Sequence, residues 1–427
     1  MLRGPSGYSM SPVGLPTWTV LPFPALVLAI AVLPIALPRA WERRSFQCFV
    51  VALCAVPLLV QFLLAARFHD IAEAITSYAS FVATLGALYV TSGGVQLSGD
   101  LEAKPSTNVG LILLGSVLAS FVGTTGASML MIRPLLWTNR QRAHRAHLIP
   151  FFIMGVANAG GLLTPLGDPP LLVGYIGGVP FFWTLRLLPA WLLYVGSNAI
   201  ALYFVDRRAY ARETAVALAR DRAEIAPLRL QGRRNVVLML LVVPAALLPL
   251  GLREGAMICI AAASLWLTPR SLHKANGFSF GPIIDVALIF AGLFACLGPI
   301  QTALADAAPW LPLRGASQLF WASGLLSSVL DNAPTYSAFA ALARGMSVSS
   351  ANLVAGVSPF KLAAVSIGSV VMGATTYIGN GPNLMIKAIA EHERFPTPSF
   401  FRYALFAFGT MLPAHIVTTI VLALLDR

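Results

Sequence analysis

The sequence contains little charge: only 11% of its 427 residues are Asp, Glu, Lys or Arg, whereas 57% are hydrophobic. Soluble globular proteins carry about 25% charged residues, so this composition excludes an ordinary soluble domain. Long apolar runs account for the difference, and several could cross roughly 30 Å of hydrocarbon as helices. The apolar runs are Trp18–Leu37, Phe46–Ala66, Ile71–Leu97, Leu187–Phe204, Val236–Leu252 and Phe401–Leu425.

Cysteine is also scarce, and the motifs of several enzyme classes are missing. The four cysteines (Cys48, Cys54, Cys259 and Cys296) lie singly in apolar runs, with no pair at metal-binding spacing. No Walker motif, metal-ligand spacing or Ser/His/Asp arrangement occurs, which argues against an ATP-driven pump and against an enzyme. An intramembrane aspartyl protease is disfavoured because Pro165, not glycine, stands three residues before Asp168 and no Tyr-Asp precedes it. We expect no cofactor other than Na⁺ as a transported or coupling ion.

The N-terminus lacks a basic region followed by a short apolar segment and a small-residue cleavage site. We therefore interpret Trp18–Leu37 as a retained transmembrane span.

The charge that is present is mostly positive: 29 Lys and Arg against 17 Asp and Glu give a formal net charge of +12. The basic residues gather in loops, where the positive-inside rule explains them better than nucleic-acid binding does. These loops, which we expect to be cytoplasmic, are Arg39–Arg44, Arg140–His147, Asp206–Arg234 and Arg270–Lys274. The prediction is an integral membrane protein, of a bacterial inner membrane, with both termini outside and with the lipid bilayer as its main partner.

The chain repeats itself. SFVGTTGASM from Ser120 aligns with SSVLDNAPTY from Ser327, which places Thr124 on Asp331. AGGLLTPLGDPPLL from Ala159 aligns with VMGATTYIGNGPNL from Val371, which places Asp168 on Asn380 and Pro170 on Pro382. The offset between aligned residues drifts slowly in one direction, as expected of one ancestral unit whose loops changed length.

The charged loops place the start of the second unit on the opposite side of the membrane from the start of the first. We therefore expect the two units to be inverted repeats. The predicted fold is an all-α polytopic membrane protein with about ten transmembrane helices, two re-entrant hairpins and two broken helices. The predicted segments are a tail (1–17), a first repeat (18–205, hairpin 108–136, broken helix 148–173), a charged cytoplasmic linker (206–235) and a second repeat (236–427, hairpin 317–345, broken helix 360–388).

Paired helix breaks in inverted repeats indicate the binding site of a secondary transporter. Asp168, in TPLGDPP, and Asp331, in VLDNAP, place carboxylates at membrane depth, where a charge costs about 2.5–3.5 kcal/mol on insertion scales. Such a carboxylate can bind either a proton or Na⁺, which is the chemistry of antiport. The alternative is that each carboxylate only caps the N-terminus of a half-helix.

These motifs, together with NAGGLLTPLGDPP and GTTGASMLMIRPLL, resemble the ion transporter superfamily, in its citrate-transporter-like branch. The chain is also similar to D-type sodium/proton antiporters and arsenite permeases, from about Leu85 to the C-terminus. The resemblance implies a transport domain that moves against a scaffold, commonly in a homodimer. It places the hairpin tips at 124–128 and 331–335, where Thr-Thr-Gly and Asp-Asn-Ala replace the Ser-Asn-Thr of sodium-coupled dicarboxylate carriers.

The predicted ion or substrate site gathers the polar residues and glycines of the four interruptions. Oxygen ligands of these kinds suit hard cations such as Na⁺, for which Asp168 and Asp331 are the predicted metal ligands. The alternative for each Asn and Thr is local, since such side chains often satisfy the backbone at helix breaks. The predicted site residues are Asp168, Asp331, Asn332, Asn158, Thr164, Gly167, Thr124, Thr125, Ser128, Thr335, Thr376, Gly379, Asn380 and Asn383.

Three further polar residues have simpler explanations. We expect Arg133 to reach the cytoplasmic interface, His415 to be a packing residue and Asp285 to be interfacial. The predicted function is a secondary active Na⁺/H⁺ antiporter working by alternating access. The alternative is a Na⁺- or H⁺-coupled transporter of citrate or a related carboxylate; a passive channel stays open as a lesser one.

Overall fold

The computed structural model of the protein describes residues 15–347 and 352–426, and is almost entirely helical within them. The predicted tail therefore lies outside the described residues except for 15–17. The helices of the first half are α1 (Pro22–Ala36), α2 (Pro38–Trp41), α3 (Arg44–Leu64), α4 (Phe68–Gly93), α5 (Pro105–Val122), α6 (Thr124–Thr138), α7 (Leu148–Gly155), α8 (Pro169–Ile176) and α9 (Leu188–Tyr210). The later ones are α10 (Ala215–Ala223), α11 (Arg233–Ala246), α12 (Leu252–Leu267), α13 (Arg270–Ala275), α14 (Gly281–Ala307), α15 (Ala316–Ser327), α16 (Asn332–Gly345), α17 (Pro359–Met372), α18 (Gly381–His392) and α19 (Phe400–Leu425).

Seven helical segments in the described parts of the chain are long and apolar enough to cross a membrane, and they include α3, α4, α14 and α19. Their outward faces carry large apolar side chains: Phe49, Leu192 and Leu405 are each more than half exposed. A large exposed apolar surface of this kind is unfavourable in water and is expected to face the hydrocarbon of a bilayer. The structure thus confirms the predicted all-α polytopic membrane protein.

Each half contains two antiparallel helices joined by a tight turn. In the first half α5 and α6 meet at Gly123, whose φ of 81° favours glycine. In the second half α15 and α16 meet at residues 328–331. These pairs coincide with the predicted hairpins 108–136 and 317–345.

Each half also contains an interrupted helix. Between α7 and α8 the chain forms a short 3₁₀ turn, η2 (Ala159–Leu163), and an extended stretch. Between α17 and α18 it forms a shorter 3₁₀ turn, η5 (Gly373–Thr375), and a second extended stretch. Both interruptions lie inside the predicted broken helices 148–173 and 360–388.

A small β-ribbon departs from the predicted helices. The apolar run Ile71–Leu97 was expected to continue as one span, but α4 ends at Gly93 and Leu97 lies in strand β1 (Gln96–Asp100). β1 pairs antiparallel with β2 (Ala226–Gln231), which belongs to the linker. Two consecutive glycines, Gly93 and Gly94, end the helix because glycine stabilises it least. The ribbon ties the first half to the start of the second.

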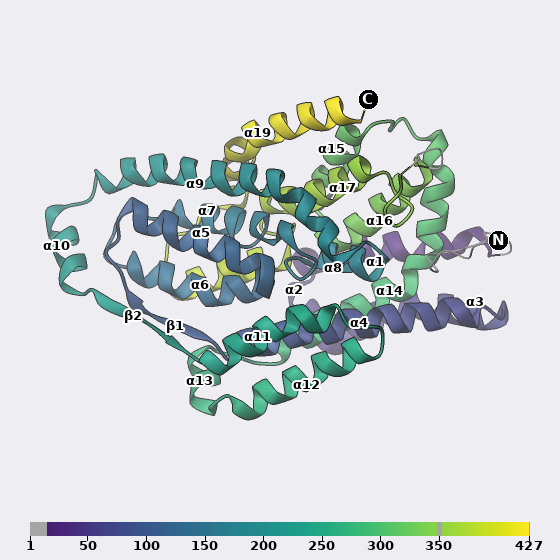
Figure 1. Cartoon of the computed structure of the whole chain (residues 1–427), viewed down its shortest axis with the longest axis horizontal. Coiled ribbons are helices and arrows are strands. Elements are labelled where there is room, and N and C mark those ends of the chain that lie inside the picture. Colours follow the sequence, from purple (N-terminus) through teal and green to yellow (C-terminus); the bar gives the residue numbers. More distant parts are fainter. Residues whose placement is uncertain (1–14, 348–351, 427) are drawn as a thin grey trace.

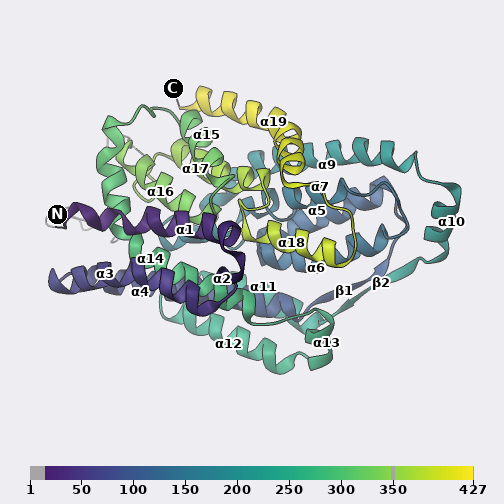
Figure 2. The same ribbon diagram turned by 180° about the vertical axis from the view of Figure 1, so that it is seen from behind.

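The helices pack in three hydrophobic clusters. The largest joins the hairpins, the interrupted helices, α9 and α19. A second joins α1, α3 and α14 with residues of α4 and α8, and a third packs α11 and α12 against α4. Figure 1 shows α10 and the ribbon at one end of the molecule, with both labelled chain ends toward the other. From behind, α1, α2 and α18 lie in front (Figure 2).

Candidate functional site

The first helix break is built by residues that cannot continue a helix. Asp168 has extended backbone (φ −147°, ψ 144°), and Pro169 and Pro170 begin α8, where their missing N–H groups cost nothing. At Gly167, a Cβ would lie 2.2 Å from the Gly161 carbonyl oxygen, so only glycine fits. Thr164 is extended as well, at φ −135° and ψ 158°.

The second break repeats this backbone. Thr376 has φ −129° and ψ 165°, and Asn380 has φ −151° and ψ 139°, close to the angles of Thr164 and Asp168. At Gly379, a Cβ would lie 2.5 Å from the Gly373 carbonyl oxygen. The alignment of Asp168 with Asn380 therefore describes two residues at the same place in the same local structure.

Each break is bonded to the hairpin of its own half. The Thr164 hydroxyl donates to the Ser120 carbonyl, and the Thr376 hydroxyl donates to the Ser328 carbonyl at 2.5 Å. These equivalent bonds match Ser120 with Ser328, and hence Thr124 with Asn332. The sequence alignment, which placed Thr124 on Asp331, is shifted by one residue because the first residues of α6 and α16 are Thr124 and Asn332.

Asp168 connects the first break to both hairpin tips. Its side chain is 2% exposed. Its Oδ1 accepts a hydrogen bond from the Thr124 hydroxyl at 2.7 Å, and its Oδ2 accepts one from the Asn332 amide at 2.6 Å. The Thr124 backbone N–H also donates to the Gly167 carbonyl at 2.8 Å. The carboxylate makes no capping hydrogen bond to the N-terminus of α8. Its hydrogen bonds go to the two hairpins instead.

Asp331 is placed differently. It is the residue before α16, its Oδ1 accepts from the backbone N–H of Ala333 at 3.3 Å, and it is half-buried. This is the helix-capping arrangement that the sequence left as an alternative. Thr335, one turn later, donates its hydroxyl to the Asp331 carbonyl at 2.9 Å. Only the neighbouring Asn332 reaches Asp168 directly.

Three asparagines join the two breaks to each other. The Asn158 amide donates to Oδ1 of Asn383 at 2.8 Å, and the Asn380 amide donates to Oδ1 of Asn158 at 3.2 Å. Asn383 also donates to the carbonyls of Gly373 and Thr376, at 2.9 and 3.0 Å. Much of their hydrogen bonding therefore satisfies backbone groups freed by the breaks, as local structure requires.

Two buried oxygens at the hairpins have no hydrogen-bond partner in the part of the chain that the structure describes. They are Oδ1 of Asn332 and Oγ of Ser128, each on a fully buried side chain. Buried polar atoms are nearly always partnered, so unpartnered ones call for an explanation. Oδ1 of Asn332 is on the same amide whose nitrogen contacts Asp168, which makes it the better placed of the two for a bound cation.

A cavity of about 70 Å³ reaches Asp168 and is lined also by Thr125, Gly167 and residues of α4 and α14. A water molecule needs roughly 10–15 Å³ of such space, so several could enter. Among the described residues, no Lys, Arg or His lines it.

The residues of α4 that line this cavity were not predicted from the sequence. They include Tyr89, whose hydroxyl donates to the Ser279 carbonyl at 2.9 Å. These residues share no motif with the breaks, so no sequence signal pointed to them.

The remaining polar candidates lie outside this arrangement. Arg133 donates to the Asn276 carbonyl at 3.1 Å, and Asp285 pairs with Arg44 at 2.8 Å on the surface. His415 is buried among aromatic rings, with Nδ1 bonded to the Tyr194 hydroxyl at 2.8 Å.

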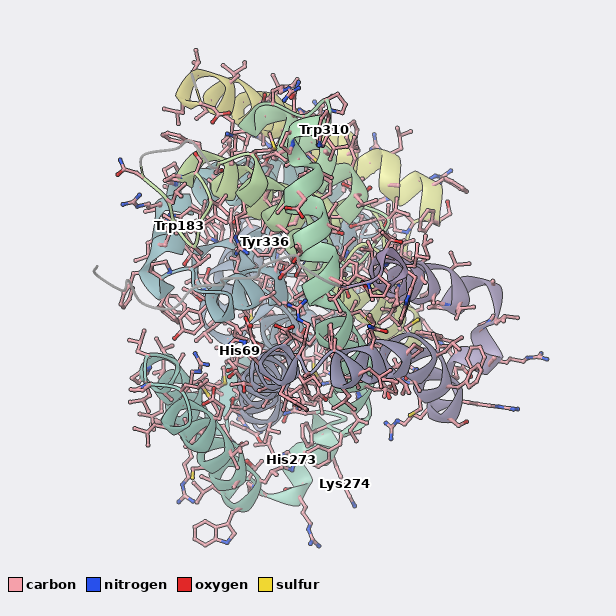
Figure 3. All side chains as sticks on the ribbon, turned by 90° about the vertical axis from the view of Figure 1, so that its right-hand side faces the viewer. His69, Trp183, His273, Lys274, Trp310 and Tyr336 are labelled. Carbon is pink, nitrogen blue, oxygen red and sulfur yellow. The ribbon has the colours of Figure 1, made fainter. Side chains whose placement is uncertain are left out.

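A separate group of His69, Asp70 and Glu73 has the spacing of metal ligands, but Asp70 is paired with Arg67. Viewed from the end opposite the ribbon, His69 lies to one side of Tyr336 and Trp310 to the other (Figure 3).

Comparison with known proteins gives one family. A family model described as "Putative citrate transport" matches residues 13–423, nearly the whole chain. No curated protein matches the sequence.

Proposed function

The chain belongs to this family of citrate-type transport proteins, and from that premise we propose that it is a secondary active transporter that binds its coupling cation at Asp168. One observation carries the proposal: a buried carboxylate at a helix break holds the tips of both hairpins. A carboxylate at membrane depth is costly and tends to serve function. The first candidate is exchange of Na⁺ for H⁺, because either ion can neutralise the same carboxylate but not both at once.

The residues around Asp168 suit this chemistry. The Thr124 hydroxyl and the Asn332 amide nitrogen donate to the ionised carboxylate, while the Asn332 amide oxygen is left over for a cation. Hard cations take oxygen ligands from carboxylates, amides, hydroxyls and carbonyls. In this proposal Asp331, the residue before Asn332, supplies a second carboxylate near the cation. Asn380 supplies the polar side chain at the equivalent place in the second break.

The test is dissipation of a pH gradient in everted membrane vesicles. We expect Na⁺ to collapse the gradient with the native protein and not with Asp168→Asn, whose amide can still bond Thr124 and Asn332. The matched control is Asp285→Asn, which removes a surface carboxylate paired with Arg44 and should keep full activity. Full Na⁺-dependent activity in Asp168→Asn, at equal protein level, would refute the assignment.

The second candidate is cation-coupled uptake of citrate or a related carboxylate, which the family description favours. The N-termini of α6, α8, α16 and α18 begin at the tips and breaks, and helix N-termini attract anions. Radiolabelled citrate uptake into proteoliposomes separates the candidates. Saturable, Na⁺-stimulated uptake that Asp168→Asn abolishes would favour this one over antiport.

We also propose how the molecule is arranged in the membrane and how it moves. The basic loops face the cytoplasm and both termini face outward, in a bacterial inner membrane. The hairpins and interrupted helices, which share one hydrophobic cluster, move together against α1, α3, α4 and α14 to give alternating access, within a homodimer. The two inverted repeats provide the symmetry for this exchange.

A further inference from the structure

We propose that the linker between the halves binds the headgroups of anionic phospholipids through seven arginines. The linker arginines are Arg207, Arg208, Arg212, Arg220, Arg229, Arg233 and Arg234. They belong to the stretch from the end of α9 to the start of α11, which includes α10 and β2. Figure 1 shows α10 at the extreme end of the molecule, with the ribbon running inward from it.

All four acidic residues of this stretch are engaged by residues 103–147 around the α5–α6 hairpin. Asp206 pairs with Arg142 at 2.6 Å, and Glu213 accepts from the backbone N–H of His144 at 2.7 Å. Asp221 accepts from the backbone N–H of Ala103 at 3.0 Å, and Glu224 pairs with Arg140 at 2.6 Å. The acids therefore attach the linker to the rest of the protein.

The arginines are left without such partners. All seven are exposed, and among the described residues none of them forms an ion pair; the eighth arginine of the stretch, Arg222, pairs with Glu102 at 3.0 Å. Because all four acids are bonded to residues 103–147, with Glu224 still partly exposed beside Arg140, the seven arginines are, in the part of the chain that the structure describes, the unpaired charges of the linker. Its counterions must come from outside the chain.

The position of the arginines indicates phospholipid as the partner. Arg207 and Arg208 follow Phe204, which is 56% exposed on the apolar face of α9, and Arg233 and Arg234 precede Val237, which is 58% exposed on α11. Side chains next to the ends of lipid-facing helices lie at headgroup level.

Apolar side chains stand exposed among the linker arginines. Val216 on α10 and Leu228 and Leu230 on β2 are examples. A basic surface with exposed apolar residues is typical of segments that lie on an anionic membrane surface. Nucleic acid, the other polyanion, would leave these apolar residues without a partner.

The experiment measures lipid selectivity of the full-length protein in phosphatidylcholine vesicles. Spin-labelled phosphatidylglycerol and spin-labelled phosphatidylcholine are compared by the fraction of each that the protein immobilises. The native protein should prefer phosphatidylglycerol, and the preference should fall at 0.5 M NaCl. Arg212→Gln/Arg220→Gln should lower it by up to about 25-fold, because each arginine near the surface contributes roughly a factor of five.

The matched control is Arg212→Lys/Arg220→Lys, which keeps the positive charge at the same two exposed positions and should leave the selectivity unchanged. Equal immobilisation of the two lipids by the native protein, or an unchanged preference in Arg212→Gln/Arg220→Gln, would overturn the proposal. So would tighter binding to a 30-base-pair DNA duplex than to phosphatidylglycerol vesicles. The assay needs no transport, so its failure is distinct from failure of the proposed function.

Discussion

At the scale of single residues, the two aspartates that the sequence treats alike are used differently. Both carboxylate oxygens of Asp168 accept hydrogen bonds from side chains of the two hairpins, whereas Asp331 accepts a hydrogen bond from the backbone of its own helix. A sequence shows that a carboxylate precedes a helix but not which donor its oxygens find. The sequence marks Asp168 as a candidate site residue, but its direct contact with Asn332, 164 residues away, could not be predicted from it.

The capping role of Asp331 predicts unequal effects of two substitutions. Asp331→Ala should lower the free energy of unfolding by about 0.5–2 kcal/mol, while Asp331→Asn should change it by a few tenths, because asparagine caps helices as well as aspartate. Thermal unfolding in detergent measures both. If Asp331→Asn is stable yet loses transport, Asp331 binds the cation as well as capping α16.

The close approach at Gly167 predicts a severe effect of one methyl group. Gly167→Ala places a Cβ 2.2 Å from a backbone oxygen, and nothing flexible can give way. We expect a loss of about 1–3 kcal/mol or more in stability. Gly381→Ala is the control in the second break, because no atom lies within 4 Å of its added Cβ. Similar melting temperatures for the two variants would contradict the geometry of the first break.

At the scale of elements, glycine and proline mark the first hairpin and both breaks in the sequence, whereas the second hairpin, with neither in its turn at 328–331, is predicted from the repeat. Gly123 ends α5, and Pro169 and Pro382 stand at the starts of α8 and α18. The β1–β2 ribbon was missed, since its pairing joins Gln96 to Gln231 across most of the first half. Composition cannot foresee pairing between such distant segments.

The bond between each break and its hairpin predicts a reciprocal pattern in hydrogen exchange. Thr164→Val removes the bond to Ser120 and should speed amide exchange in α5 and α6. Thr376→Val removes the bond to Ser328 and should speed exchange in α15 and α16. Each net bond is worth about 0.5–1.5 kcal/mol, so exchange from local opening should rise by roughly two- to tenfold. Faster exchange of both hairpins in either variant would mean that the halves are not locally independent.

At the scale of the whole molecule, the ribbon and its carboxylates join the halves outside the apolar region. Burial raises the pKa of Asp100, only partly offset by Arg140 at 3.3 Å. Hydrogen bonds from Lys104 and Arg222 lower the pKa of Glu102 two residues on. These opposite shifts give the two groups opposite links between pH and stability.

The opposite pH dependences of stability that Asp100 and Glu102 cause can be tested with one pair of variants. The raised pKa of Asp100 means that its contribution is present below the ordinary carboxyl pKa and is lost as pH rises through the raised value. Asp100→Asn should therefore gain melting temperature relative to the native protein as pH rises toward 7. Glu102 contributes above its ordinary pKa and loses that contribution as pH falls, so Glu102→Gln should show its deficit at pH 7 and not at pH 3. Deficits of the same sign at pH 7 would contradict the prediction.

The donors around Asp168 differ in a way that matters for the two proposed cargoes. A hydroxyl can reverse its hydrogen bond, so a proton placed on Oδ1 could point at the Thr124 oxygen while the Asn332 N–H stays on Oδ2. Na⁺ brings no hydrogen and needs lone pairs, which the Asn332 amide supplies through Oδ1, the oxygen that has no hydrogen-bond partner among the described residues. The two ions would therefore act on different hairpins: protonation would reverse the hydrogen bond of Thr124 in the first, and cation binding would engage the free Asn332 oxygen of the second.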